Sequence, residues 1–416
     1  MVKIGLVILA VLSLFITFFA LWPIVVTKQN VTKQNLISTI DLNPKSDVLV
    51  IPLAIGINPL DNRLYILTIN EDSGTNEIVV IDSLSNDVID TITLPGYHYS
   101  VLTHIEVNPE TKRIYIANSD SNNKIHVING ITNKIIMAIE IEDGVEGITI
   151  NTVTNKIYAV NNKMATVTVI DGKTNKKTDV IKLQDDIGIF FDSGGIKVNP
   201  FNNRIYVLKD STRKKSTNTT AILKDGLGLP RVRFIPGDET IKGKEIIVID
   251  GSTKGIIKRV KLDFDALSKV IDEKIINNTF FHKFSASSGI VIPEYKIEIN
   301  PTINRIYINV SILNLDSYGL NSLLVMDGVT NNIIEAINVD LIQGSSGGIT
   351  VNPATNRIYL NDLWNNKVKV IDGSSNQVIS EFKTDDQPSL IKVDPFTNRI
   401  YIGSNESGKV TIKNDN

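Results

Sequence analysis

Carboxylates in the irregular loops are the side chains of this 416-residue sequence best suited to binding a hard cation. The candidates are Asp143, Glu146, Asp185, Asp186, Asp192, Asp385 and Asp386. Ca²⁺ takes about six to eight oxygen ligands, so acidic loops that converge could hold it. None of these residues has EF-hand spacing, and acidic surface loops are common. We therefore predict no cofactor and keep calcium as the ion that these loops could bind.

Histidine is scarce, and three of the four, His98, His104 and His282, fall in segments that could reach one face of the molecule. Three imidazoles can bind zinc or copper. Their spacing matches no motif, so they are weak metal candidates. The sequence has no nucleophile elbow, P-loop or H-E-x-x-H pattern and no cysteine. We therefore predict no catalytic residue and exclude a Cys-ligated metal.

A basic segment lies between residues 209 and 244. It holds nine Lys and Arg residues against four Asp and Glu residues, in a chain whose net charge is −2. Its densest part, Arg213-Lys214-Lys215, could bind anionic lipid or a polyanionic partner. The alternative is a solvated flexible loop. The charge of the whole chain argues against general nucleic-acid binding.

The segments that connect these loops are copies of one sequence repeat. The repeat is easiest to recognise between residues 348 and 383. Four β-rich runs alternate with turns in it: 349–351, 357–360, 367–371 and 377–382. Asn352-Pro353 and Asp372-Gly373 supply turn chemistry between them. Four short antiparallel strands in about 36 residues are typical of one propeller blade.

The second strand of the unit carries a tyrosine that follows Leu or Ile and a basic residue, and this phrase occurs seven times. The tyrosines are Tyr65, Tyr115, Tyr158, Tyr206, Tyr307, Tyr359 and Tyr401. The last copy stops after its third strand, 409–413, whereas residues 35–42 resemble a fourth strand. We predict an all-β, seven-bladed β-propeller of four-stranded antiparallel blades, in which the N-terminal strand completes the last blade.

The phrases VNPATNRIYL and VKVIDGSSNQVI resemble the YVTN β-propeller repeat, which is best known from extracytoplasmic and archaeal surface-layer-type proteins. The resemblance covers nearly all of the chain after residue 35. It implies a seven-bladed propeller. It implies no reaction, because the family has no shared catalytic residues.

Charged residues recur at fixed places in the repeats: a basic residue opens the second strand and an acid closes the third. The pairs are Arg63 and Asp82, Lys156 and Asp171, Arg204 and Asp250, Arg305 and Asp327, and Arg357 and Asp372. Antiparallel pairing places the two positions side by side. We therefore expect each pair to meet across its hairpin as a structural device.

Two segments around the fourth blade do not follow the repeat. They are an insertion at residues 209–244 and a linker at residues 263–294. The linker contains DALSKVIDEKI, residues 265–275, whose apolar spacing predicts a short amphipathic helix. The linker and the acidic loops connect fourth strands to the next first strands, opposite the Asn-Pro turns. We predict that this irregular face is the working surface.

The N-terminus is apolar from Ile4 to Val26, apart from Ser13, Thr17 and Pro23. As a helix of about 1.5 Å per residue this run is roughly 34 Å long, enough to cross a bilayer core of about 30 Å. We predict a single-pass membrane anchor at residues 1–27, with the propeller, residues 28–416, on the extracytoplasmic side of the cell membrane. The alternative is a cleaved signal sequence and a secreted propeller.

These features favour a recognition or scaffolding module that binds a protein or a cell-envelope polymer through one face of the ring. The rival hypothesis is a propeller enzyme, similar to a lyase or a quinoprotein, with its site at the mouth of the central channel. Fold alone does not separate the two. Convergent His and acidic side chains with perturbed pKa values at the axis would favour the enzyme.

Overall fold

Seven four-stranded antiparallel sheets and one two-stranded sheet make up the architecture. The chain divides into two units, Met1–Leu36 and Ile37–Asn416, and all the strands belong to the second. The computed structural model describes residues 38–42, 49–70, 73–98, 103–118, 123–142, 144–161, 164–183, 195–210, 221–224, 230–233, 243–263, 293–312, 320–339 and 346–415.

Each blade is a meander, with its first strand innermost. The first blade comprises β2 (Val50–Asn58), β3 (Arg63–Asn70), β4 (Thr75–Asp82) and β5 (Val88–His98). The second comprises β6 (Thr103–Asn108), β7 (Arg113–Asn118), β8 (Lys124–Asn129) and β9 (Lys134–Glu140). The third comprises β10 (Gly147–Asn151), β11 (Lys156–Asn161), β12 (Thr166–Asp171) and β13 (Lys176–Lys182).

The remaining blades follow the same order. The fourth comprises β14 (Ile196–Asn199), β15 (Arg204–Asp210), β18 (Gly243–Asp250) and β19 (Ile256–Asp263). The fifth comprises β20 (Pro293–Asn300), β21 (Arg305–Ile312), β22 (Leu320–Asp327) and β23 (Ile333–Asn338). The sixth comprises β24 (Ser346–Asn352), β25 (Arg357–Asp362), β26 (Lys367–Asp372) and β27 (Gln377–Lys383). The seventh comprises β28 (Pro388–Asp394), β29 (Arg399–Ser404), β30 (Lys409–Asn414) and β1 (Ser38–Asp41).

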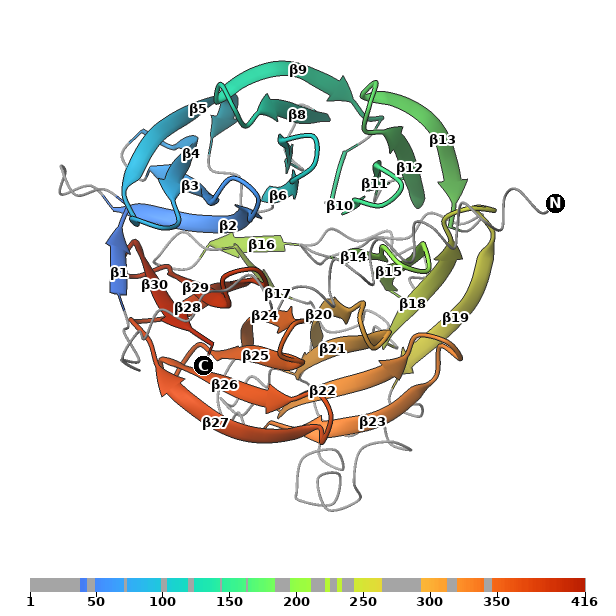
Figure 1. The fold of residues 1–416 in the computed structure, drawn as a ribbon. Helices are drawn as coiled ribbons and strands as arrows, with labels where there is room; N and C mark the ends of the chain where they lie inside the picture. The colour runs from blue at the N-terminus through green and yellow to red at the C-terminus, as the bar shows by residue number, and fades with distance from the viewer. Residues whose placement is uncertain are drawn as a thin grey trace, which may run out of the picture. The chain divides into compact units, whose positions relative to one another are not determined.

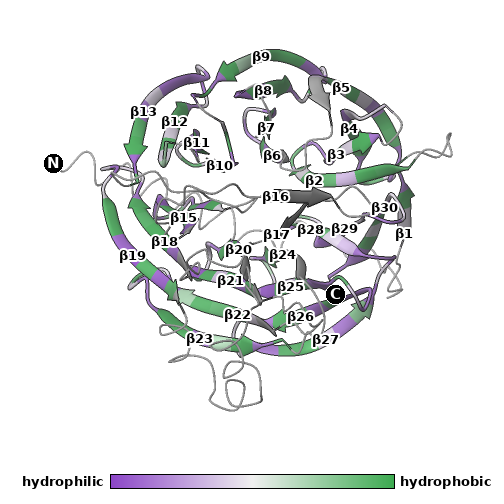
Figure 2. Ribbon diagram, turned by 180° about the vertical axis from the view of Figure 1, so that it is seen from behind, coloured by the Kyte–Doolittle hydropathy of each residue, from purple (hydrophilic) through white to green (hydrophobic). Residues whose placement is uncertain are grey.

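The innermost strands contact one another in sequence around the axis and return from β28 to β2, so the ring is closed (Figure 1). The second and third strands are almost wholly buried, because neighbouring blades cover both of their faces. The fourth strands form the circumference, and hydrophobic and hydrophilic residues alternate along them, as β19 and β27 show in Figure 2. The prediction of a seven-bladed all-β propeller is confirmed.

The hydrophobic core lies between the blades. Seven buried clusters each join one blade to the next, and each contains one repeat tyrosine. Tyr65, for example, packs with Ile92 of its own blade and with Ile105 and Ile116 of the second blade. The tyrosine therefore recurs because every interface between blades needs the same large side chain.

The N-terminal strand completes the last blade, as the sequence predicts. β1 pairs antiparallel with β30, with Ser38 opposite Ile412 and Asp41 opposite Lys409. Ile40 points inward with 5% of its surface exposed and packs with Tyr401. This pairing covers the edge of β30 that would otherwise be open.

The two faces of the ring carry different turns. At one face, first-to-second-strand turns of neighbouring blades are joined to each other and to third-to-fourth-strand turns. We call this the Asn-Pro face. The connection face, opposite, carries the second-to-third-strand turns and the links between blades. Because β15 and β19 both end at the connection face, the insertion at 209–244 and the linker at 263–294 leave the ring on the same side.

Several predicted features fall outside the described residues: the anchor at residues 1–27, the helix at residues 265–275 and most of the insertion. Within the described part of the chain, no helix is long and apolar enough to cross a membrane. The insertion does contain one element that the sequence did not predict. β16 (Ala221–Lys224) and β17 (Pro230–Arg233) pair as an antiparallel hairpin.

Candidate functional site at the axis of the ring

One residue of each innermost strand, two positions before the strand's last residue, lies directly opposite the repeat tyrosine on the second strand. These residues are Gly56, Glu106, Thr149, Lys197, Glu298, Thr350 and Lys392. Apolar residues flank each of them and pack between the blades. The charged members influence one another across non-neighbouring blades, Glu106 acting on Lys197 and Lys392 acting on Glu298. Two acids and two bases thus alternate around the axis.

Lys197 and Glu298 form the central ion pair of this ring. Their Nζ and Oε1 atoms are 2.9 Å apart, and the side chains are 19% and 18% exposed. Burial by itself lowers the pKa of Lys197, but the carboxylates of Glu298 and Glu106 outweigh it and raise that pKa above its usual value. Burial raises the pKa of Glu298, and Lys197 and Lys392 outweigh that effect and lower it. Both groups are therefore held in their charged forms.

A cavity of about 160 Å³ adjoins the ring between the first, second and seventh blades. Its wall includes Glu106, Lys392, Gly56, Pro59 and Pro395. A methyl group on Gly56 would lie 2.8 Å from Val107 Cγ2, so the glycine is needed for close packing there. Sites for small organic ligands usually measure at least about 300 Å³. The cavity suits a small polar group better than a substrate.

His104 lies two residues before Glu106 on β6. Burial, and to a lesser extent the charge of Lys197, lower its pKa to about 4, although a hydrogen bond with the backbone of Glu146 acts in the opposite direction. Its Nε2 atom is buried with no hydrogen-bond partner. His104 is therefore neutral at ordinary pH and does not add a third positive charge to the ring.

We expect the imidazole of His104 to show a titration midpoint near 4 by NMR, well below the ordinary 6.5. Between pH 6.5 and about 4 the unfolded chain binds a proton at His104 and the folded chain does not. The free energy of unfolding therefore decreases as the pH falls through this range. His104→Gln should reduce this acid sensitivity. His126→Gln, in a third strand, should act in the same direction but less, because burial lowers the pKa of His126 as well, though less strongly than that of His104. A midpoint near 6.5 in the folded protein would contradict the burial of His104.

The acidic candidates are not gathered into one site where the structure describes them. Asp385 accepts a hydrogen bond from Thr411 Oγ1 at 3.2 Å, and Asp386 accepts one from Asn366 Nδ2 at 2.8 Å. Glu146 lies beside His104. Within the described residues no three His, Asp or Glu side chains are arranged to hold a metal ion. The other acidic candidates, Asp143, Asp185, Asp186 and Asp192, lie outside the described residues.

The remaining metal and basic candidates are only partly described. His98 ends β5 opposite Thr75, and its side chain is outside the described part. His282 and the basic run Arg213, Lys214 and Lys215 are also outside it. The structure describes the side chain of His104 alone among these three histidines, and it lies near the axis. The convergence of His98, His104 and His282 therefore stays a prediction.

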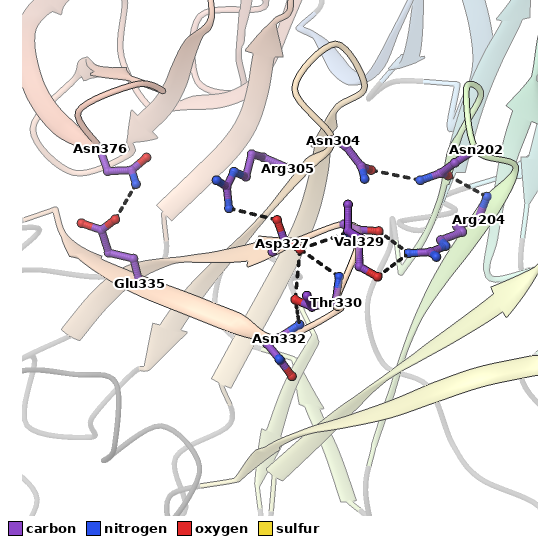
Figure 3. A network of polar contacts seen from close by, with 11 residues as sticks. Asn202, Arg204, Asn304, Arg305, Asp327, Val329, Thr330, Asn332, Glu335 and Asn376 are labelled. Atoms are coloured by element: carbon purple, nitrogen blue, oxygen red, sulfur yellow. Dashed lines mark hydrogen bonds and ion pairs between the residues drawn. The ribbon is translucent and has the colours of Figure 1, made fainter.

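The prediction about charged pairs across the hairpins needs a correction. The register is as expected, with Arg204 opposite Asp250 and Arg305 opposite Asp327, and Arg305 does contact Asp327 at 3.4 Å. Arg204, however, donates to the carbonyl oxygens of Gly328 and Val329 in the next blade (Figure 3). Arg357 likewise pairs with Asp415 in the next blade. Arg204 and Arg357 therefore contact the neighbouring blade, where the sequence predicted a contact with the acid across their own hairpin.

The acids of the same pairs stabilise turns. Asp327 Oδ1 accepts hydrogen bonds from the backbone N–H groups of Val329 and Thr330 at 3.1 and 2.8 Å (Figure 3). The bond from the backbone of Thr330 is the largest cause of the lowered pKa of Asp327, and the bond from Val329 also lowers it. An Asp at the start of such a turn satisfies two backbone donors, which explains why the repeat places an Asp before Gly.

Arg113 offers a test of the contacts between blades. Its NH1 group donates to Gly172 O at 2.6 Å and to Lys173 O at 3.2 Å. Arg113→Ala should lower the free energy of unfolding by about 1.5–3 kcal/mol, the usual loss for hydrogen bonds to a charged group. Lys124→Ala in the same blade breaks an exposed ion pair of 3.7 Å and serves as the control. Equal losses in urea unfolding would contradict the role of Arg113.

A ladder of asparagines also joins the blades, and sequence reasoning missed it. The Asn that ends a first strand donates its amide to the Asn in the next blade's first turn. The bonds are Asn108 to Asn155, Asn151 to Asn203, Asn199 to Asn304 and Asn300 to Asn356, each 2.8 Å, and Asn352 to Asn398, 2.9 Å. The acceptor residues have φ between 50° and 55°, which Asn tolerates well. Aligning the seven copies by position would have revealed both this ladder and the axial ring.

A protein of known structure has a similar fold. Hydrazine synthase from Kuenenia stuttgartiensis is similar to this chain with a TM-score of 0.62 and 13% identity, over 93% of this chain and 99% of that chain. At this identity the likeness concerns the propeller fold alone. No protein-family profile matches the chain, and no curated protein matches its sequence. The resemblance to the YVTN repeat therefore rests on the repeated phrases themselves.

Proposed function

We propose that this chain is a membrane-anchored, extracytoplasmic propeller that recognises or scaffolds a partner through its connection face. The observation that carries the proposal is the state of the axis. Its central charged groups, Lys197 and Glu298, form an ion pair, and the adjoining cavity is small. Both observations support a structural role for the axis and recognition through a face of the ring.

The perturbed pKa values at the axis weigh against acid–base chemistry there. A general acid or base works best when its pKa lies near the working pH. The pKa of Lys197 is raised, and those of Glu298 and His104 are lowered, so each moves further from neutrality. Ion-pair networks that only stabilise structure shift pKa values in this same manner.

A propeller enzyme with a site at the channel mouth is the second candidate. It is favoured by the acid Glu106 and the base Lys392, which line one cavity, and by the name of its structural neighbour, a synthase. The directions of the pKa shifts weigh against it. The recognition module is the better supported of the two.

The connection face suits recognition because the irregular parts of the chain leave the ring there. The insertion at 209–244 and the linker at 263–294 follow β15 and β19, which both end at that face. Trp364, in a second-to-third-strand turn of the same face, is 56% exposed. An exposed aromatic side chain, on a face from which long loops leave the ring, is typical of a contact surface for a protein or a cell-envelope polymer.

Membrane anchoring is the part of the proposal that the apolar run supports. Residues 4–26 are long enough to span a bilayer as a helix. The propeller begins at Ile37, after a short polar stretch. Cleavage of the run as a signal would give a secreted propeller with the same connection face.

The test uses the full-length chain with a photo-crosslinking residue at position 364, on the connection face, or at position 201, on the Asn-Pro face. After irradiation of intact cells, the variant at 364 should form a distinct protein or polymer adduct and the variant at 201 should not form the same adduct. Extraction with alkaline carbonate should leave the chain in the membrane pellet. Release of the chain by carbonate would contradict the anchor, and absence of any adduct at 364 would contradict recognition through the connection face.

A further inference from the structure

Exposed apolar side chains gather in the turns of the Asn-Pro face. Eight large hydrophobic residues that are at least 38% exposed lie in these turns: Leu60, Leu84, Ile131, Val153, Phe201, Ile303, Val329 and Phe396. Among the described residues of the connection-face turns, only Met164 and Trp364 are comparable. Contiguous apolar surface on a soluble domain usually marks a docking site.

The apolar surface continues over the rim of the Asn-Pro face. Fourth strands start at that face, and their first residues are exposed and apolar in several blades. Examples are Val88 and Ile89 of β5, Ile256 and Ile257 of β19, and Val378 and Ile379 of β27. Residues further along the same strands alternate with charged ones, as Figure 2 shows for β19 and β27. The apolar character is therefore strongest at the Asn-Pro end of the ring.

The N-terminal segment enters the propeller at this same face. β30 ends at the Asn-Pro face, since Asn414 lies opposite Arg399 at the start of β29. β1 runs antiparallel to it, with Ser38 opposite Ile412 near that end and Asp41 opposite Lys409 at the connection face. Ser38, the first described residue of the propeller, therefore lies at the end of β1 that is nearer the Asn-Pro face.

Only ten residues, 28–37, separate the proposed anchor from β1. Fully extended, such a segment spans at most about 36 Å. A propeller tied this closely to a bilayer, with its attachment point at the rim of the Asn-Pro face, can bring that face to the lipid headgroups. The length and the entry point of the chain thus identify what the apolar face meets.

We propose that the Asn-Pro face docks on the surface of the bilayer that holds residues 1–27. This inference rests on the membrane anchor of the proposed function and adds an orientation to it. The exposed turn residues Leu84, Phe201 and Val329 insert into the headgroup region, where apolar side chains gain from leaving water. The connection face, with Trp364, then points away from the membrane towards its partner.

Lysines near the apolar turns select the kind of lipid. Lys134, Lys173 and Lys176 are exposed around the third-to-fourth-strand turns of the second and third blades. Each lysine close to an anionic surface contributes about 1 kcal/mol of attraction. These lysines add attraction for an anionic phospholipid headgroup, and acids in the same set of turns, such as Asp87 and Asp171, partly offset it.

The absence of cysteine from the chain makes a labelling experiment direct. Full-length Phe201→Cys and, as the control on the connection face, Trp364→Cys are each labelled with a nitroxide and reconstituted into vesicles of phosphatidylcholine and phosphatidylglycerol. Electron paramagnetic resonance measures collisions with oxygen, which partitions into lipid, and with a water-soluble nickel complex. We expect a several-fold lower nickel accessibility and a higher oxygen accessibility at 201 than at 364.

A second set of variants tests the apolar contact itself. Leu84→Glu combined with Val329→Glu should raise the nickel accessibility at position 201 several-fold, while circular dichroism and the melting temperature stay unchanged, because both side chains are exposed. Met164→Glu on the connection face is the matched control and should change nothing. Pure phosphatidylcholine vesicles should show a weaker protection at 201 than mixed vesicles.

Flotation of the vesicles separates the two proposals. If the chain does not float with the vesicles after a carbonate wash, the anchor is wrong and the docking inference falls with it. If it floats but labels at 201 and 364 are equally accessible to nickel, the anchor stands and docking is overturned. If the label at 201 is shielded from both nickel and oxygen and shows spin–spin broadening, a second copy covers the face, and docking on lipid is again overturned.

Discussion

Deletion of residues 28–42 from the full-length chain is expected to open the ring at the seventh blade. The deletion removes β1, its four-residue pairing with β30, and the buried side chains of Ile40 and Leu42. Each such side chain contributes about 1.5–3 kcal/mol by leaving water. The loss is a large share of the about 5–15 kcal/mol by which proteins are usually stable.

Limited proteolysis with mass spectrometry checks this result. Cleavage should begin in the seventh blade, between residues 388 and 415, because β30 then has an unpaired edge. Deletion of residues 28–34 keeps β1 and should leave the protease pattern of the parent. A truncated chain as resistant as the parent would show that the pairing of β1 does not hold the ring closed.

A point substitution gives the same test with less disturbance. Ile40→Ser should cost about 2–4 kcal/mol, as large-to-small changes in a core do. Thr39, the neighbouring residue on the exposed side of β1, is the matched control, and Thr39→Ser should stay within about 0.5 kcal/mol. Urea unfolding measures both. Equal effects would mean that the inward side of β1 is not part of the core.

The ion pair at the axis should show the second large effect. Lys197→Met leaves Glu298 without its 2.9 Å partner, and Glu298→Gln leaves Lys197 without its own. Removing one partner of a buried pair typically costs about 3–5 kcal/mol, and the partial exposure of this pair places the loss near the lower end. The double variant should cost less than the sum of the two, because neither member of the pair is then left charged without the other.

The pH dependence of stability distinguishes this pair from a simple packing effect. Glu298 has a pKa lowered below the ordinary 4.5, so its contribution is complete above that pH and is lost as the pH falls through the lowered value. Lys197 has a pKa raised above the ordinary 10.5, so its contribution is complete below that pH and is lost only at higher pH. The difference between parent and Lys197→Met should be constant between these limits and shrink in acid.

If the difference in unfolding free energy between the parent and Lys197→Met does not change in acid, the ion pair of Lys197 and Glu298 does not stabilise the axis. Lys392 also acts on Glu298, so Lys392→Met is a useful comparison and should have a smaller effect. A loss of partner crosslinking at Trp364 in any of these axial variants, while they remain folded, would contradict the separation between a structural axis and a recognising face.

The local pattern of the sequence determined the blades, their number and the closure by β1. Alternation of apolar residues and the turn chemistry at Asn352-Pro353 and Asp372-Gly373 act over a few residues, and seven copies make the pattern unmistakable. The basic residue and the acid of each hairpin, such as Arg204 and Asp250, were also placed in the correct register, because antiparallel pairing fixes it locally.

Only the tertiary structure decided what these side chains contact. Arg204 meets carbonyl groups more than 120 residues away because the next blade lies beside its hairpin. Lys197 meets Glu298 because two innermost strands converge at the axis, although the residues are far apart in the chain. The entry of β1 from the Asn-Pro side likewise depends on ring closure. Strand pattern is a local property, whereas contacts between blades depend on how seven sheets close into a ring, which no single repeat specifies.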